Sequence, residues 1–191
     1  MGRIVRIAIV LVALGVVALI LVRGAGISAR RDSWPMEERV ATAAWRLLIP
    51  RESRDAINPV PNDTDVLRRA LEHWADHCAV CHAADGSGQS TVGQRTYPRA
   101  PDMRLPATQT LTDGELFYAI EQGIPWTAMP GWRTGTPDGE RASWELVRFI
   151  RHLPNLTPAE LTEMETFLPK SPGQRKRDQE IDDILRGRGK N

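Results

Sequence analysis

Near its middle the chain reads His77-Cys78-Ala79-Val80-Cys81-His82, and this stretch decides how the rest is interpreted. Cys78 and Cys81 are the only cysteines among 191 residues. Side chains three residues apart lie on the same face of a helix, so both thiols and the following His82 are expected on one helical turn. A single close pair of cysteines excludes a disulfide-stapled secreted fold, so the two residues are expected to act together.

Cys-x-x-Cys-His is the attachment pattern of a c-type haem. The two thiols suit the vinyl groups of the porphyrin, with which they form thioethers, and His82 then donates a ring nitrogen to the iron. A thioredoxin-like pair would need a βαβ context, which this sequence does not show. A zinc site would need four ligands, and only His73, His77 and His152 remain besides the motif. The pattern therefore predicts one covalently attached haem c, with Cys78, Cys81 and His82 as binding residues.

The N-terminal segment indicates the cellular compartment. Residues 7–22 contain no polar side chain and would span roughly 24 Å as a helix. Starting at Ile4 lengthens the helix to about 28 Å, close to the thickness of a hydrocarbon core. The segment is apolar on every side, which argues against a buried core helix. An uncleaved membrane anchor is the favoured interpretation, and a removed signal peptide is the alternative. Either one brings the chain to the export machinery.

The remaining sequence predicts helices and no convincing strand, so we expect an all-α protein. A first helix is expected over 35–49, and others start near 62, at 112, near 140 and at 157. Thr112 to Glu115 forms a capping box, with Gly123 placed to end that helix. The predicted organisation is an anchor (1–24), a linker with one helix (25–61), a domain (62–169) and a charged tail (170–191).

The distribution of charge narrows the choice of partners. The chain has 25 Lys and Arg against 24 Asp and Glu, but residues 60–169 hold only 9 basic residues against 15 acidic ones. Nucleic-acid binding depends on Lys and Arg that neutralise phosphates, so nucleic acid is not an expected partner. An acidic domain is compatible with docking to a basic protein surface, and equally with a solvated surface that keeps the domain soluble.

About half of the chain, from residue 64 to 153, resembles the class I, mitochondrial-type cytochrome c domains of bacteria. Ala70 stands eight positions before the first cysteine, where the family has a small residue at a close helix crossing. Trp74 stands four positions before it and Phe149 lies in the last helix of the match, where the family pairs two aromatic residues. The Gly-rich turn after the motif, at residues 83–88, is also similar. The resemblance implies the class I fold, with helices packed around the haem behind the transmembrane helix.

The resemblance also implies a methionine as the second axial ligand, from a proline-containing loop before the last helix. Met129, in Thr127-Ala128-Met129-Pro130, matches that position, and ligation by His82 and Met129 raises the potential of a haem. Met103 is the chief rival, although it stands where the family usually has a leucine. The three other histidines are better interpreted as helix-surface residues. The other ring nitrogen of His82 is expected to donate to a backbone carbonyl near Pro98 or Pro101.

Other side chains near these loops have less certain roles. Arg95, Arg99 and Arg104 could pair with haem propionates, but at least two of them are expected in solvent. Trp126 and Trp132 flank the methionine and could cover the porphyrin or belong to an ordinary core.

The predicted function is transfer of single electrons between redox partner proteins by a monohaem cytochrome. The chain would be a single-pass protein of the cytoplasmic membrane with its haem domain in the periplasm or outside the cell, and it would not be an enzyme. A five-coordinate haem that senses a gas or activates oxygen is one alternative. A fixed cytochrome subunit of a membrane oxidoreductase is another. Neither the oligomeric state nor the electron donor and acceptor follows from the sequence.

Overall fold

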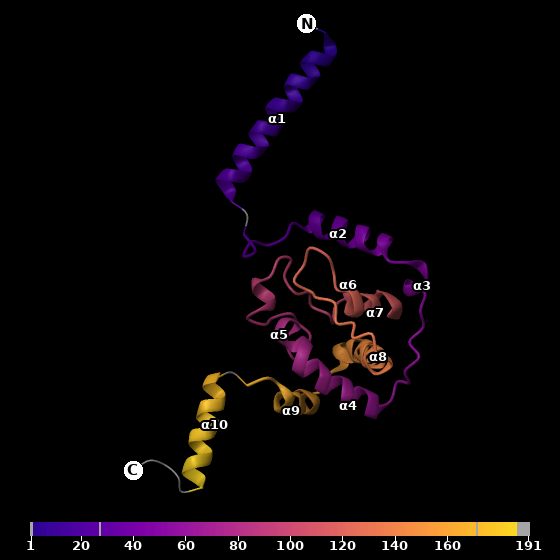
Figure 1. Ribbon diagram of the computed structural model, residues 1–191, viewed down its shortest axis with the longest axis vertical. Helices are drawn as coiled ribbons and strands as arrows, with labels where there is room; N and C mark the ends of the chain where they lie inside the picture. Colours follow the sequence, from indigo (N-terminus) through magenta and orange to yellow (C-terminus); the bar gives the residue numbers. More distant parts are fainter. Residues whose placement is uncertain (1, 27, 171, 187–191) are drawn as a thin grey trace.

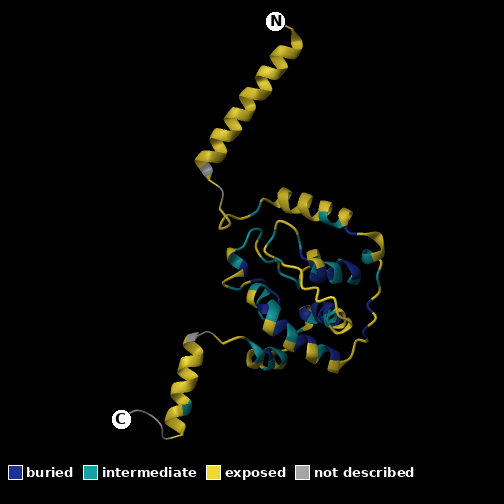
Figure 2. Cartoon of the chain, in the orientation of Figure 1, coloured by how far each residue is buried: buried dark blue, intermediate teal, exposed yellow. Residues whose placement is uncertain are grey.

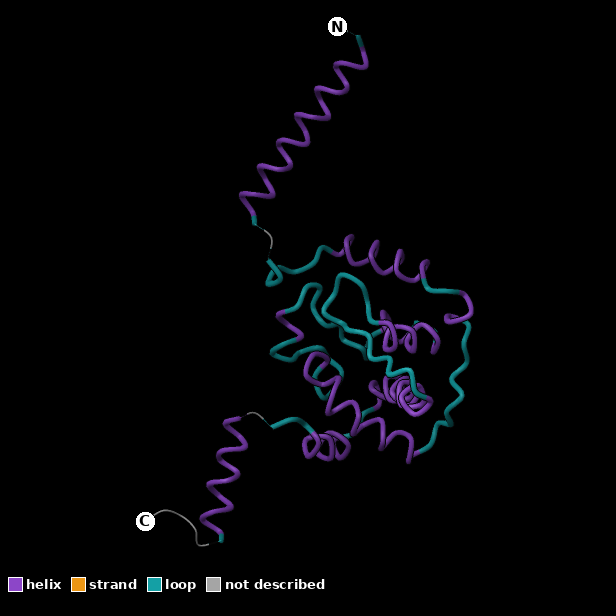
Figure 3. Tube along the Cα trace, in the orientation of Figure 1, coloured by secondary structure: helices purple, strands orange, loops and turns teal. Residues whose placement is uncertain are grey.

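The computed structural model describes residues 2–26, 28–170 and 172–186, and every regular element in these ranges is helical (Figure 3). The predicted all-α class is therefore confirmed. The longer helices are α1 (Arg3–Ala25), α2 (Pro35–Leu48), α4 (Thr64–His73), α7 (Asp113–Gln122), α8 (Pro137–His152), α9 (Pro158–Phe167) and α10 (Pro172–Leu185). The short ones are α3 (Arg51–Arg54), η1 (Trp74–Cys78), α5 (Ala79–His82), η2 (Gly93–Arg95), α6 (Pro106–Gln109) and η3 (Leu153–Asn155).

Helix α1 stands away from the rest of the molecule, and its described side chains are exposed (Figures 1 and 2). An 18-residue window within residues 3–24 has a mean hydropathy of 3.0, and none of that window is buried in the protein. Its length and composition suit a membrane span, although a signal sequence near an N-terminus has the same properties. The helix begins slightly before the segment predicted from Ile4.

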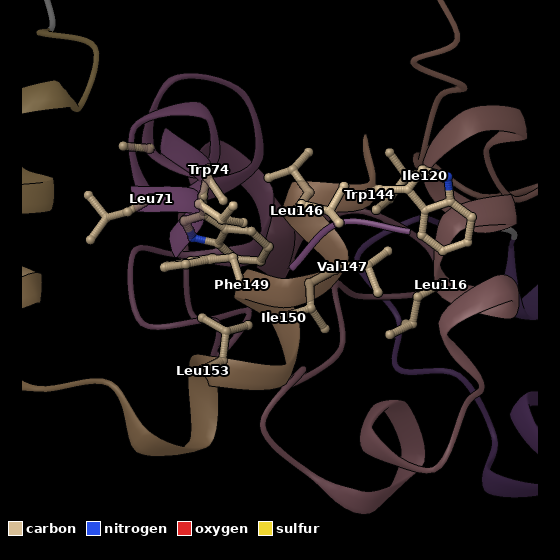
Figure 4. Packing of buried hydrophobic residues seen from close by; sticks show 14 of the residues in the cluster. Leu71, Trp74, Leu116, Ile120, Trp144, Leu146, Val147, Phe149, Ile150 and Leu153 are labelled. Carbon is tan, nitrogen blue, oxygen red and sulfur yellow. The ribbon is translucent and has the colours of Figure 1, made fainter. Parts of the chain in front are cut away.

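The core of the domain lies where α4 crosses α8. Ala70 is almost fully buried on α4, and its small side chain lets the two helices approach each other closely. Trp74 packs against Phe149 of α8 with ring centroids 5.5 Å apart, as the sequence predicted (Figure 4). The neighbouring Leu71 and Leu153 extend this cluster. The helix crossing thus fixes the segment that leads directly into the Cys-x-x-Cys-His motif.

Helix α7 packs against the other part of α8. Phe117 and Trp144 stack with centroids 3.9 Å apart, and Leu116 and Ile120 are buried beside them. The predicted capping box at Thr112 is present, because Glu115 Oε2 accepts from the Thr112 N–H at 2.8 Å and the Thr112 hydroxyl accepts from the Glu115 N–H. The helix ends at Gly123, as predicted from its C-terminal glycine.

The chain between α2 and α4 lies against this domain. Ile49 and Val60 are buried, and the Asn58 amide donates to the Trp144 carbonyl at 3.0 Å. Gly114 of α7 lies so close to α3 that an added Cβ would come within 2.0 Å of the Ser53 carbonyl oxygen. The part of the predicted linker that follows α2 is therefore well attached to the domain surface.

Two helices follow the domain core. Helix α9 begins at a Thr157 capping box with Pro158 at its first position, as the sequence predicted, and buries Met164 against the core. Helix α10 extends away from the domain and is exposed along most of its length (Figures 1 and 2).

Candidate functional site

The motif lies on a helical segment that changes from α-helix to π-helix and back to α-helix. Five residues of π-helix, Trp74–Cys78, connect α4 to the single turn of α5, which ends at His82. Wide π turns inside helices often occur at functional sites. The turn is closed behind the motif by the Ser90 hydroxyl, which donates to the carbonyls of Val80 and Cys81 at 2.7 and 2.9 Å. Trp74 adds a bond from its indole N–H to the Ala83 carbonyl at 3.2 Å.

A glycine holds the following loop against the motif. A Cβ added to Gly93 would lie 2.0 Å from the Cys81 carbonyl oxygen, which is closer than any side chain could be placed. Only a residue without a side chain can occupy this position while the loop keeps its path. The loop therefore supports the second cysteine from behind.

Cys78 and Cys81 form no disulfide and carry free thiols. Burial and the neighbouring Cys81 raise the pKa of the Cys78 thiol to about 12, so it is protonated at neutral pH. This environment does not suit a reactive thiolate, whose pKa is usually lowered by nearby positive charge. Cys78 is therefore not placed to act as a reactive thiolate.

His82 is largely enclosed. Burial lowers the pKa of its imidazole to about 4, so the ring is neutral at physiological pH and keeps a lone pair for a metal. Its Nδ1 atom is buried and has no hydrogen-bond partner among the described residues. The predicted bond to a carbonyl near Pro98 or Pro101 is therefore absent, because that loop does not bring an acceptor to Nδ1.

The cavity beside His82 is a partly open cleft between the motif segment, the loop after α7 and the first half of α8. It contains about 730 Å³ of space not filled by protein atoms, part of which is open to solvent. Most of its wall is apolar. The residues lining it are His73, Trp74, His77, Cys78, His82, Met103, Ile120, Met129, Trp132, Thr134, Gly139, Ala142, Ser143, Leu146 and Ile150.

Met129 reaches this cavity from the loop between α7 and α8. Its N–H is held by the Thr127 hydroxyl at 3.1 Å, and its carbonyl accepts from the Ile124 N–H at 3.1 Å. The Trp132 N–H donates to the Ile120 carbonyl at 2.9 Å, which fastens the loop to the end of α7. The structure therefore brings three of the four predicted binding residues, Cys78, His82 and Met129, to one cavity. Cys81 is half-buried beside it and is not among the lining residues.

Met103 lines the same cavity. Its N–H donates to the carbonyl of Gly86 at 2.8 Å, which fastens it to the turn that follows His82. Met129 comes from the loop between α7 and α8, so the two methionines reach the cavity from different parts of the chain.

The placement of His73 and His77 corrects the sequence prediction. Both were interpreted as helix-surface residues, but both line the cavity. Their rings meet edge to face at 5.0 Å, and His77 also meets Trp132 at 5.4 Å. They follow α4 into the π turn, on the same continuous segment as His82. Because His73 and His77 are four residues apart, the sequence indicates that they share a helix face. Only the tertiary fold shows that this face borders the cleft.

The loop arginines do not border the cavity. Arg104 is held by Asp85 and Asp102, at 2.8 and 2.7 Å, and Arg99 pairs with Asp32 at 2.7 Å. The tryptophans beside Met129 differ from each other. Trp132 lines the cavity, whereas Trp126 is 95% exposed at the outer edge of the loop.

Helix α8 supplies wall residues that the sequence analysis did not single out. Ser143, Leu146 and Ile150 follow one another at intervals of three and four residues, a spacing that indicates one helix face. Thr134 and Gly139 carry no pattern that would have indicated a cavity.

The residues present fit a covalently bound haem. Two free thiols three residues apart, a buried histidine that is neutral at physiological pH, and a thioether sulfur lie at or beside one apolar cleft. A metal coordinated only by protein would need a different donor set, because no cluster of three or more His, Cys, Asp or Glu residues suited to a metal occurs among the described residues.

Comparison with known protein families agrees with this chemistry. A family model described as cytochrome c oxidase, cbb3-type, subunit III, matches residues 65–150. The matched range runs from the start of α4 to the end of the Trp74–Phe149 core and contains the whole motif and the Met129 loop. A comparison with curated proteins gave no significant match. The match supports a c-type cytochrome domain over residues 65–150, and a domain of this kind is associated with haem-based electron transfer.

Proposed function

We propose that the protein is a membrane-anchored monohaem electron carrier with His82 and Met129 as axial ligands. When bound, a haem supplies one iron that alternates between the ferrous and ferric states. Cys78 and Cys81 would hold the porphyrin by two thioethers, and His82 would donate a ring nitrogen to the metal. The observation that carries the proposal is the convergence of Cys78, His82 and Met129 on one apolar cleft.

The protein groups around the cleft are suited to this role. Trp74, Leu146 and Ile150 form an apolar wall, which excludes water. An apolar surrounding would favour the oxidation state of the haem that carries less charge. The Met129 loop is closed by backbone hydrogen bonds to the end of α7, which would keep the thioether near the metal during a change of charge. With both axial positions taken by protein, no substrate would need to bind, and the chain would not act as an enzyme.

The location of the protein is part of the same proposal. An uncleaved α1 would place the domain on the outer face of the cytoplasmic membrane, in the periplasm or at the cell exterior, where c-type haems are attached. Apolar composition of α1 and its complete exposure support an anchor. The domain would exchange electrons with membrane-bound redox partners, either as a tethered carrier or as a fixed subunit. The second possibility draws on the description of the matched family, which names an oxidase subunit.

Visible spectroscopy of the full chain tests the ligand assignment. We would express the protein with haem-maturation machinery, denature it, and ask whether the haem remains attached. We expect retention of the haem, a low-spin spectrum in both oxidation states and no reaction with carbon monoxide. Met129→Ala should abolish the methionine–iron charge-transfer band and open the iron to carbon monoxide, whereas Met103→Leu, the matched control, should leave both properties unchanged.

Each contrary result has a definite meaning. Haem lost on denaturation would refute attachment by Cys78 and Cys81. A charge-transfer band that disappears in Met103→Leu and persists in Met129→Ala would exchange the roles of the two methionines. Ready binding of carbon monoxide by the unmutated protein would show an open position, as in a gas-sensing or oxygen-activating haem protein.

A further inference from the structure

Helix α2 presents its apolar side to solvent. Val40 and Leu47 are 63% and 78% exposed, and no side chain of the helix is fully buried. The exposed apolar residues repeat at helical spacing, so they share one face of the helix. This face, called here the outer face of α2, consists of Met36, Val40, Ala43, Ala44 and Leu47.

The opposite side of α2 faces the domain with the half-buried Trp45 and with polar contacts. Arg46 forms a two-bond ion pair with the fully buried Glu115 of α7, at 2.8 and 3.1 Å. Glu37 accepts a hydrogen bond from the Tyr97 hydroxyl at 2.6 Å. Ile49, just after the helix, is buried in the domain surface. A surface helix of a soluble protein usually turns its apolar stripe inward, and α2 has the reverse arrangement.

The position of α2 in the chain suggests what covers the outer face. Only nine residues separate the end of α1 from the start of α2, and a chain of that length reaches at most about 30 Å. In Figure 1, α2 lies along the edge of the domain on the side from which α1 extends. If α1 spans a membrane, α2 cannot be far from the membrane surface.

The flanking residues have the composition of a membrane interface. Trp34 precedes the helix and is 65% exposed, and tryptophan is enriched at the level of lipid head groups. Arg30, Arg31 and Arg39 are exposed nearby, where they can meet anionic phosphates. The combination of an apolar face, flanking arginines and tryptophan is typical of helices that lie in the plane of a membrane interface.

We propose that α2 is such an interfacial helix and that its outer face lies in a phospholipid surface. The inference rests on the part of the proposed function that makes α1 a membrane anchor. Because Arg46 and Glu37 connect the other side of α2 to α7 and to the loop of Tyr97, the domain is held at a fixed tilt instead of swinging on its tether. The haem cleft then keeps one orientation toward membrane-bound partners.

Hydrogen exchange in lipid nanodiscs tests contact with the membrane. The full chain, with its haem, would be placed in nanodiscs of phosphatidylcholine with and without phosphatidylglycerol. We expect exchange of α2 amides to be about tenfold slower than in Val40→Glu/Leu47→Glu, a factor that corresponds to about 1.4 kcal/mol. The matched control, Ile57→Glu/Ile184→Glu, changes two equally exposed apolar residues away from α2 and should retain the protection.

Linear dichroism of the haem bands in oriented bilayers tests the fixed tilt. The unmutated protein should show a definite dichroic ratio, and Val40→Glu/Leu47→Glu should lose the dichroism while α1 still anchors it. Arg46→Gln should separate the two parts of the proposal, because it leaves the outer face intact. It should keep the slow exchange of α2 and reduce the dichroism.

The outcomes distinguish this inference from the proposed function. Attached haem with equally fast α2 exchange in the unmutated protein and in Val40→Glu/Leu47→Glu would overturn the membrane contact and leave the electron-carrier proposal intact. Absence of attached haem would refute the carrier, but α2 exchange would still report on the membrane. Protection that appears only in a purified complex with another membrane protein would also overturn the inference, because a protein would then cover the outer face.

Discussion

The two sides of the haem cleft are built in different ways. His82 lies at the end of a continuous helical segment, one residue after Cys81, and its surroundings are buried. Met129 lies in a loop whose outer edge is exposed and which depends on hydrogen bonds to the end of α7. The histidine side is therefore fixed within a buried helical segment and by the loop packed behind it, and the methionine side by hydrogen bonds within an exposed loop and to the end of α7. This difference predicts that a substitution on the histidine side prevents attachment of the haem. A substitution on the methionine side should leave the haem attached and only free its sixth coordination position.

Gly93→Ala should have the largest effect on stability and haem attachment, because Gly93 packs against the motif that contains His82. The new Cβ would collide with the Cys81 carbonyl oxygen, and backbone cannot yield as a flexible side chain can. We expect a loss of about 1–3 kcal/mol in unfolding free energy, as in overpacked cores. The yield of protein with attached haem should fall severalfold, measured by haem staining of denatured protein. A normal yield and stability would show that this loop does not support the motif.

Gly123→Ala makes the matching change on the methionine side. Gly123 has φ +71°, and an added Cβ would lie 2.6 Å from the Gly131 nitrogen and 2.7 Å from the Met129 carbonyl oxygen. The left-handed conformation alone costs an L-residue about 1–2 kcal/mol. The haem should remain covalently attached, but the charge-transfer band should weaken and carbon monoxide should bind to a fraction of the protein. Unchanged carbon monoxide binding would argue that the loop does not position Met129.

Trp126→Gly should have the smallest effect. Trp126 is a bulky residue at φ 59° and is 95% exposed, so its conformation is strained and its side chain contributes little packing. Glycine should relieve about 1 kcal/mol of backbone strain, offset in part by the greater flexibility of the unfolded chain. Chemical denaturation should show a change within about 1 kcal/mol, with the charge-transfer band intact. A lost band would mean that the exposed ring holds the loop in place.

Local patterns allowed much of the fold to be predicted. The capping box at Thr112 and the threonine N-cap at Thr157 correctly placed the starts of α7 and α9, because their hydrogen bonds connect residues only three apart. Helix α2 was predicted over 35–49 and is found at Pro35–Leu48. The apolar character of α1 was equally plain. The contact between Trp74 and Phe149 was predicted through the family resemblance, since nothing local relates residues 75 positions apart.

Long-range contacts account for the errors. The surroundings of His77 were misjudged because the edge of the cleft is formed by Trp132, which is far away in the sequence. The acceptor expected for His82 Nδ1 is missing because the path of the loop through Pro98 and Pro101 depends on its contacts with the motif and with α2. Such contacts leave no periodic pattern in the sequence.

The sequence by itself determined the attachment motif, the apolar N-terminal helix and the all-α class. Each of these depends on residue types within one or a few helical turns, where spacing alone dictates which side chains share a face. Only the tertiary structure decided that Met129 and His82 reach the same cleft and that α2 turns its apolar face outward. Both features depend on how separate helices pack. The sequence shows which residues share a face of a helix, but only the packing shows whether that face points to the domain or to solvent.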